Sequence, residues 1–191
     1  MEEITTVDEF LSLTQNDVMT LEASNEQNIT WYIDAAFAVH EDVRSHSGAT
    51  MTLGKGMIIS GSTKQKINTR SSTEAELVGM DDYVSKVLWT KFFIEAQEFP
   101  VNQNIVLRDN TSTMKLEVNG KWSSGKRTRH YVTDLIKRNE IESKYCPTEK
   151  IIADYMTKQL VGSKFKHFRK EIMNLPDSAS RSMLEKKIKS N

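Results

Sequence analysis

Four carboxylates fall at positions where separate elements can bring them together. Asp34 lies inside an apolar strand, Glu76 in the first turns of a long helix, and Asp109 at the end of a later strand. Asp154 lies in a helix near the end of the chain. A lone Asp is disfavoured within a strand. If the two strands pair, Asp34 and Asp109 are neighbours at one edge of the sheet, where the helices can add Glu76 and Asp154.

Carboxylates that cluster in a low dielectric repel one another unless hard cations lie between their oxygens. The chemistry that needs such a cluster is phosphodiester hydrolysis assisted by two Mg²⁺ ions about 4 Å apart. Each acid also has an ordinary explanation. Glu76 can favour the helix N-terminus through the dipole, Asp109 can cap the next turn, and Asp154 can be an exposed helix residue. The residues alone leave these alternatives open.

A central helix from about residue 71 to residue 99 positions one of the acids. Ser71 or Ser72 is a suitable N-cap, and Glu74 or Glu76 follows in the first turns, which is typical of a helix start. Apolar residues then recur at helical spacing, namely Leu77, Met80, Val84, Val87, Leu88, Phe92 and Ile94. This periodicity predicts a helix with one face in the core.

Strands are predicted around this helix by alternating apolar residues and turn signals. They cover residues 29–39, 49–54, 57–66, 104–108 and 141–146. Further helices are predicted at 111–118 and 130–138, followed by one capped by Thr148 that carries Asp154. The order predicts an α/β fold with a five-stranded mixed sheet and helices on both faces.

Composition agrees with one globular domain. The chain has 191 residues, of which 38% are hydrophobic and 27% charged. Residues 1–28 hold seven acids and no Lys or Arg, so the remainder carries 26 basic and 19 acidic residues, a net charge of +7. We predict an acidic leader at 1–28, a domain at 29–175 and a basic tail at 176–191. No apolar run can cross a bilayer, no signal peptide is visible, and Cys146 has no second cysteine to pair with, which favours an intracellular, cytoplasmic protein.

The sequence resembles the ribonuclease H domain of copia-type retrotransposon polyproteins. The resemblance rests on motifs in the family's order: WYIDAAFA at 31–38, RSHSG at 44–48, KQK at 64–66, SSTEAE at 71–76, DN at 109–110, KRTRH at 126–130, YCPTE at 145–149, Ala153-Asp154 and Thr157-Lys158. It implies a ribonuclease H-like fold and cleavage of the RNA strand of RNA–DNA hybrids with two Mg²⁺ ions, which Mn²⁺ can replace. The catalytic, metal-binding acids it implies are Asp34, Glu76, Asp109 and Asp154, with Glu74 as the alternative to Glu76.

The resemblance also implies where the hybrid and a protein partner bind. Cations and hydroxyls that grip the nucleic-acid backbone would be Lys64, Lys66, Arg70, Ser71 and Ser72, joined by Asn110 and His130. Lys64 and Lys66 are equally an ordinary solvated strand end. His130 would assist product release or proton transfer near neutral pH, but a structural hydrogen bond at a helix start is the more common role of such a histidine. Residues 20–30 resemble the linker to the polymerase region of the parent polyprotein. The resemblance also implies a virus-like particle or the nucleus as further locations of the protein.

One departure from the family pattern follows His130, where a segment worth roughly two helical turns is missing. The helix there is expected to be shortened or shifted in register, and Asp154 to be at risk of misplacement. A degenerate domain that only binds nucleic acid or serves a structural role is therefore the main alternative to an active enzyme. An integrase-like nuclease of the same fold class is a third alternative, and the chain is expected to be a fragment of a decayed element or an excised domain.

Overall fold

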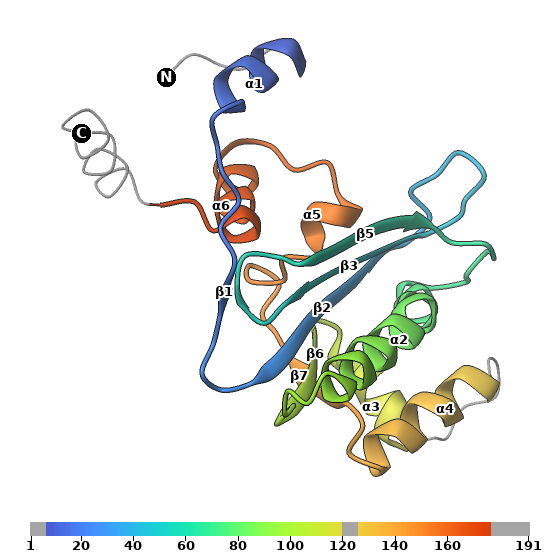
Figure 1. Cartoon of the computed structure of the whole chain (residues 1–191). Coiled ribbons are helices and arrows are strands. Elements are labelled where there is room, and N and C mark those ends of the chain that lie inside the picture. The colour runs from blue at the N-terminus through green and yellow to red at the C-terminus, as the bar shows by residue number, and fades with distance from the viewer. Residues whose placement is uncertain (1–6, 120–125, 177–191) are drawn as a thin grey trace.

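A five-stranded mixed sheet forms the centre of the computed structural model, which describes residues 7–119 and 126–176 (Figure 1). The strands run in the order β5-β3-β2-β6-β7. Their bounds are β2 Asn28–Ala36, β3 His46–Thr52, β5 Ile59–Lys64, β6 Gln103–Arg108 and β7 Glu142–Tyr145. β2, β3 and β5 are antiparallel neighbours, whereas β6 pairs parallel to β2 and β7 parallel to β6.

Helices cover both faces of this sheet (Figure 1). On one face lie α2 Ser72–Ala96, α3 Thr111–Asn119 and α4 Lys126–Lys137. On the other lie α5 Asp154–Thr157 and α6 Gly162–Met173. α2 packs directly on β2 and β3, and α5 packs on the same two strands from the opposite side.

The main core fills the space between α2 and the sheet. β2 turns Ile29, Trp31 and Ile33 toward this core, and all three are buried. The buried stripe of α2 includes Met80 and Val87, at the spacing of one helix face. Full burial of each such side chain stabilises the fold by roughly 1.5–3 kcal/mol. The core therefore fixes α2 on β2, two of the elements that carry the predicted acids.

The predicted fold class is confirmed, and most predicted elements lie within a few residues of those observed. The largest difference lies before Asp154. Thr148 does not cap a helix there, because residues 148–150 form a turn and α5 begins only at Asp154. α4 runs without interruption from Lys126 to Lys137, through the point after His130 where the resemblance implies that a segment is missing.

The N-terminal segment contacts the domain that follows it. α1 spans Val7–Thr14, and β1 Glu22–Ala23 pairs with β4 Gly54–Lys55 in a small second sheet. Arg169 in α6 forms an ion pair with Asp17 at 2.5 Å. The domain boundary at residue 28 remains a prediction. Among the described helices, none combines the length and apolar character needed to cross a membrane.

Gly48 gives the fold a testable point, because it lies opposite Asp34 in the β2–β3 register and beneath α5. A Cβ on Gly48 would lie 2.5 Å from Thr157 Cγ2 and 2.8 Å from Met156 Cβ. We expect Gly48→Ala to lower the free energy of unfolding by about 1–3 kcal/mol through overpacking, measured by urea denaturation.

A double variant tests the cause of that loss. Thr157→Ser removes the methyl group that is nearest to the added Cβ but keeps the hydroxyl. Combined with Gly48→Ala, it should recover part of the lost stability, as a favourable coupling between the two sites. Additive effects of the two substitutions would contradict the steric explanation.

Candidate metal centre

Three of the four predicted acids meet at one edge of the sheet. Asp34 lies near the end of β2, Asp109 directly follows β6, and Glu76 lies in the second turn of α2. One carboxylate oxygen from each lies within 4.8 Å of the others. The parallel pairing of Tyr32 with Leu107 explains why Asp34 and Asp109 are neighbours, since each lies two residues after its member of that pair.

Glu76 is held by two neighbours and is nearly inaccessible to solvent. Its Oε1 accepts a hydrogen bond from the backbone N–H of Ala35 at 3.1 Å. Its Oε2 accepts one from Arg108 Nη2 at 3.1 Å, and the same nitrogen donates to the Glu76 carbonyl oxygen at 2.6 Å. Arg108 is fully buried, so this ion pair joins α2 to β6 within the protein. Loss of one partner of a buried pair typically costs about 3–5 kcal/mol.

The choice between Glu74 and Glu76 follows from the helix geometry. Glu74 accepts a hydrogen bond from the backbone N–H of Arg70 at 2.7 Å, and Ser71 Oγ accepts one from the N–H of Glu74 at 3.2 Å. These bonds cap the start of α2. Glu74 therefore stabilises the helix end at the surface, and Glu76 is the acid that faces Asp34.

Asp154 does not belong to the group of three. It is completely buried, but its Oδ1 accepts a hydrogen bond from Lys158 Nζ at 2.5 Å and its Oδ2 accepts one from Lys164 Nζ at 2.6 Å. Lys158 Nζ also lies 3.5 Å from Asp34 Oδ2, and the Thr157 hydroxyl donates to that same oxygen. Asp154 is thus linked to Asp34 only indirectly, through the ammonium group of Lys158.

Burial raises the pKa of two of the acids. Burial raises the pKa of Glu76 from 4.5 to about 7; the Arg108 guanidinium opposes the rise and the Asp34 carboxylate adds to it. Burial also raises the pKa of Asp34, against the opposing effects of Lys158 and Thr157. Both carboxylates are therefore harder to ionise in the folded protein unless a cation accompanies them.

Several of the predicted substrate-binding residues are already bonded to other groups of the protein. Lys64 forms an ion pair with Asp42 at 2.8 Å, whereas Lys66 and Arg70 have exposed side chains. Ser71 caps α2, and Ser72, which begins it, is exposed. Asn110 Oδ1 accepts from the N–H of Thr113, a capping role at the start of α3. The side chain of His130 lies outside the described part of α4.

Besides Thr157 and Lys158, two further side chains contact the acids of this centre without being predicted from the sequence. The first is Arg108, whose only signal is a cation at the end of the otherwise apolar segment 105–107. The second is Thr148, whose hydroxyl donates to Asp109 Oδ2 at 2.9 Å. Both side chains fix the direction of a carboxylate, because each bonds one of its oxygens.

A divalent cation fits the residues of the centre. Carboxylate oxygens are the ligands that Mg²⁺ and Mn²⁺ prefer. Asp34 is only 2% exposed and lies next to two further acids, so a cation between them would remove the repulsion. Asp34, Glu76 and Asp109 are the residues that would hold it.

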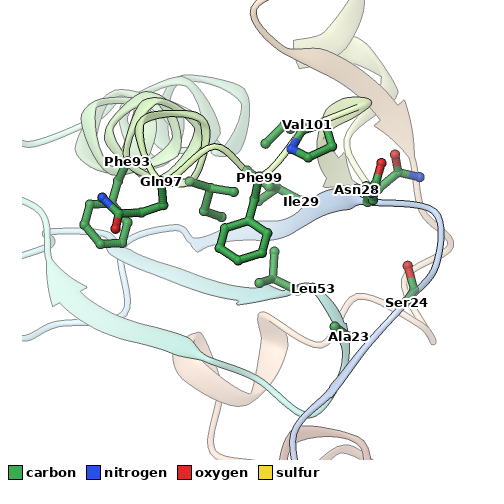
Figure 2. Close-up of a pocket in the computed structure, with 12 residues that line it drawn as sticks. Ala23, Ser24, Asn28, Ile29, Leu53, Phe93, Gln97, Phe99 and Val101 are labelled. Atoms are coloured by element: carbon green, nitrogen blue, oxygen red, sulfur yellow. The ribbon is translucent and has the colours of Figure 1, made fainter.

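An apolar hollow of about 410 Å³ lies away from these acids, at the start of β2 (Figure 2). Ile29, Leu53 and Phe99 line it, together with Phe93 from the end of α2. Asn28 and Ile29 lie about five residues before Asp34, which is roughly 17 Å along an extended strand. The hollow and the acidic group are therefore separate features.

The raised pKa of Glu76 predicts how stability depends on pH without metal. The folded protein holds this proton up to about pH 7, whereas the unfolded chain releases it near 4.5. Stability should fall as pH rises through that window, by about 3 kcal/mol for Glu76 at 1.4 kcal/mol per pKa unit. Urea unfolding with a chelator at pH 5 to 8 measures it. Glu76→Gln should flatten the dependence, and an equally steep slope in that variant would contradict the assignment.

Comparisons with known proteins place this geometry in a known fold. No family model matches the sequence. A ribonuclease H1 isolated from compost by a metagenomic approach aligns with a TM-score of 0.51 and 14% identity, over 69% of this chain and 93% of that one. The ribonuclease H1 of the halophilic archaeon Halobacterium salinarum aligns with a TM-score of 0.46 and 14% identity, over 68% and 94% of the two chains. The compost enzyme in complex with an RNA/DNA hybrid gives a TM-score of 0.47 and 15% identity, over 68% and 94%. With its mixed five-stranded sheet covered on both faces, this chain has a ribonuclease H-like fold.

Proposed function

We propose that the protein is a metal-dependent endoribonuclease that cleaves the RNA strand of RNA–DNA hybrids. The observation that carries the proposal is the convergence of Asp34, Glu76 and Asp109, three acids from distant parts of the chain, within 4.8 Å. In the ribonuclease H-like fold, this convergence at the ends of β2 and β6 supports a cation-binding role for the three acids. The proposed substrate class is supported by the compost ribonuclease H1, whose solved structure contains an RNA/DNA hybrid.

A divalent cation bound there would stabilise negative charge on a scissile phosphate and activate water. The chain's own residues prepare the site. Arg108 holds Glu76 toward Asp34, and Thr148 holds one oxygen of Asp109. The exposed side chains of Lys66 and Arg70 add positive charge that can bind phosphates. Such contacts hold the nucleic-acid backbone without depending on base sequence. The hybrid would be selected by its shape and 2′-hydroxyls.

We further propose that the domain derives from a copia-type retrotransposon reverse transcriptase and works beside a polymerase region. The support is the order of sequence motifs, which fall on the elements of the centre. The motif at 31–38 covers the end of β2, the motif at 71–76 starts α2, and 153–158 covers α5. Mg²⁺ is the proposed cofactor, since the ligands are all carboxylates.

A hydrolysis assay tests the proposal with a matched pair of variants. Labelled hybrid is incubated with Mg²⁺ and wild-type protein, Asp109→Asn or Asp81→Asn. Asp81 is an exposed acid of α2. We expect Asp109→Asn to lower the rate at least ~100-fold, because a metal contributes several kcal/mol to the transition state. Asp81→Asn should stay within about twofold. Equal cleavage by all three proteins would contradict the proposed site.

A non-catalytic nucleic-acid-binding domain is the second candidate. It is favoured by the engagement of both Asp154 oxygens with Lys158 and Lys164, which leaves three acids in the group. Fluorescence anisotropy with labelled hybrid distinguishes the candidates. Salt-dependent binding of the hybrid by folded wild-type protein, without hydrolysis in Mg²⁺ or Mn²⁺, would support the binding domain and contradict the enzyme. The integrase-like alternative is tested with duplex DNA that has processed ends, and strand transfer of those ends by the wild-type protein would support it.

A further inference from the structure

The Thr157-Lys158 pair has no role in the proposed hydrolysis, yet both side chains point to the acids. Thr157 ends α5 and its hydroxyl donates to Asp34 Oδ2. Lys158 follows directly, with Nζ 2.5 Å from Asp154 Oδ1 and 3.5 Å from Asp34 Oδ2. One ammonium group thus lies between two carboxylates from elements 120 residues apart, because 154 − 34 = 120.

Burial explains why a cation is needed at this point. Asp34 is 2% exposed and Asp154 is 0% exposed, so each carboxylate has lost nearly all its water. An unpaired buried charge costs several kcal/mol. Lys164 neutralises Asp154 from the other side through Oδ2, at 2.6 Å. Lys158 is the group that serves both acids, and it reaches them from a partly exposed position.

We propose that Lys158 takes the place between Asp34 and Asp154 that a second divalent cation would need. This inference rests on the proposed metal site at Asp34, Glu76 and Asp109. Lys158 is then a positioning residue: it fixes Asp34 for the first cation and keeps Asp154 from binding another. The protein alone binds one divalent ion, in place of the two that the resemblance implies.

The proposal has a physical consequence beyond activity. An ammonium group carries one positive charge and occupies the oxygens that a divalent ion would use. A second ion must displace Lys158 from Asp154 Oδ1, and it is also repelled by the ammonium group while that group remains. Removal of the amine with the stem retained should therefore open a second binding position.

Ion counting tests this directly. Mn²⁺ alone is titrated into the full chain, with calorimetry and the loss of the free-ion magnetic resonance signal as readouts. We expect one ion in wild type, two in Lys158→Met, and one in Lys158→Arg, which keeps the charge. Lys86→Met removes an exposed lysine of α2 as a matched control and should bind one. Asp109→Asn should bind none with comparable affinity.

Stability gives a second readout that does not need catalysis. Without metal, Lys158→Met should melt below wild type, because Asp34 and Asp154 lose a shared counter-charge. Mn²⁺ should raise its melting temperature more than that of wild type, since two ions bind the folded state. If Lys158→Met does not fold, the Asp154→Asn, Lys158→Met double variant removes one acid with the amine and should fold and bind one ion.

The outcomes separate this inference from the proposed function. Two ions bound by wild type together with hybrid cleavage would overturn the role of Lys158 and leave the enzyme proposal standing. One ion in both wild type and Lys158→Met would also overturn it. One ion in wild type and two in the variant would support it, whatever the hydrolysis assay shows. No ion in any variant would overturn both proposals.

Discussion

The desolvation of carboxylates at one edge of the sheet is the constraint on which the rest of the centre depends. Asp34, Glu76 and Asp154 are all buried, and burial raises the pKa of Asp34 and of Glu76. Cationic side chains from two sides of the sheet offset the cost of burying these carboxylates. Arg108 approaches from β6 beneath α2, and Lys158 and Lys164 approach from the α5–α6 side. The Arg108–Glu76 pair joins α2 to β6, and the Lys158–Asp34 pair at 3.5 Å joins the end of α5 to β2.

Close approach of the layers makes this arrangement sterically feasible. Gly79 lets α2 lie against β2, since a Cβ there would be 3.3 Å from the Cβ of Ala35. Ala35 in turn presents its backbone N–H to Glu76. Gly48 has the same effect for α5 on the opposite face. The small residues Gly79, Ala35 and Gly48 thus let α2 and α5 lie close to Asp34 from opposite faces of the sheet. A displacement of either helix would therefore move a carboxylate or the cation that pairs with it.

The sequence predicts those features that local patterns determine. The strand around Asp34 and the helix start at Ser71 have clear periodicity and capping signals, and the order of elements limits how β2 and β6 can pair. The contacts of side chains across layers have no such signal. In the sequence, Arg108 has the pattern of an ordinary strand end. Its contact with Glu76 forms only when α2 packs on the sheet. Glu74 and Glu76 share one motif, and only the helix rotation of about 200° over two residues separates their directions. The sequence predicts Asp154 as a fourth member of the acid group, because it does not show that Lys158 and Lys164 bind both oxygens of this carboxylate.

The resemblance implies that a segment is missing after His130, but a shorter helix there and the placement of Asp154 are physically independent. α4 is continuous from Lys126 to Lys137 and packs on α2 and α3, on one face of the sheet. Asp154 begins α5, which packs on β3, β2 and α6 on the other face. Its carboxylate direction is set locally, by a lysine one helical turn later and by another at the start of α6. A shorter α4 would have to act across the whole sheet to move it, whereas Lys158 and Lys164 contact it directly. The α5–α6 segment therefore decides whether the Asp154 carboxylate joins the other three acids.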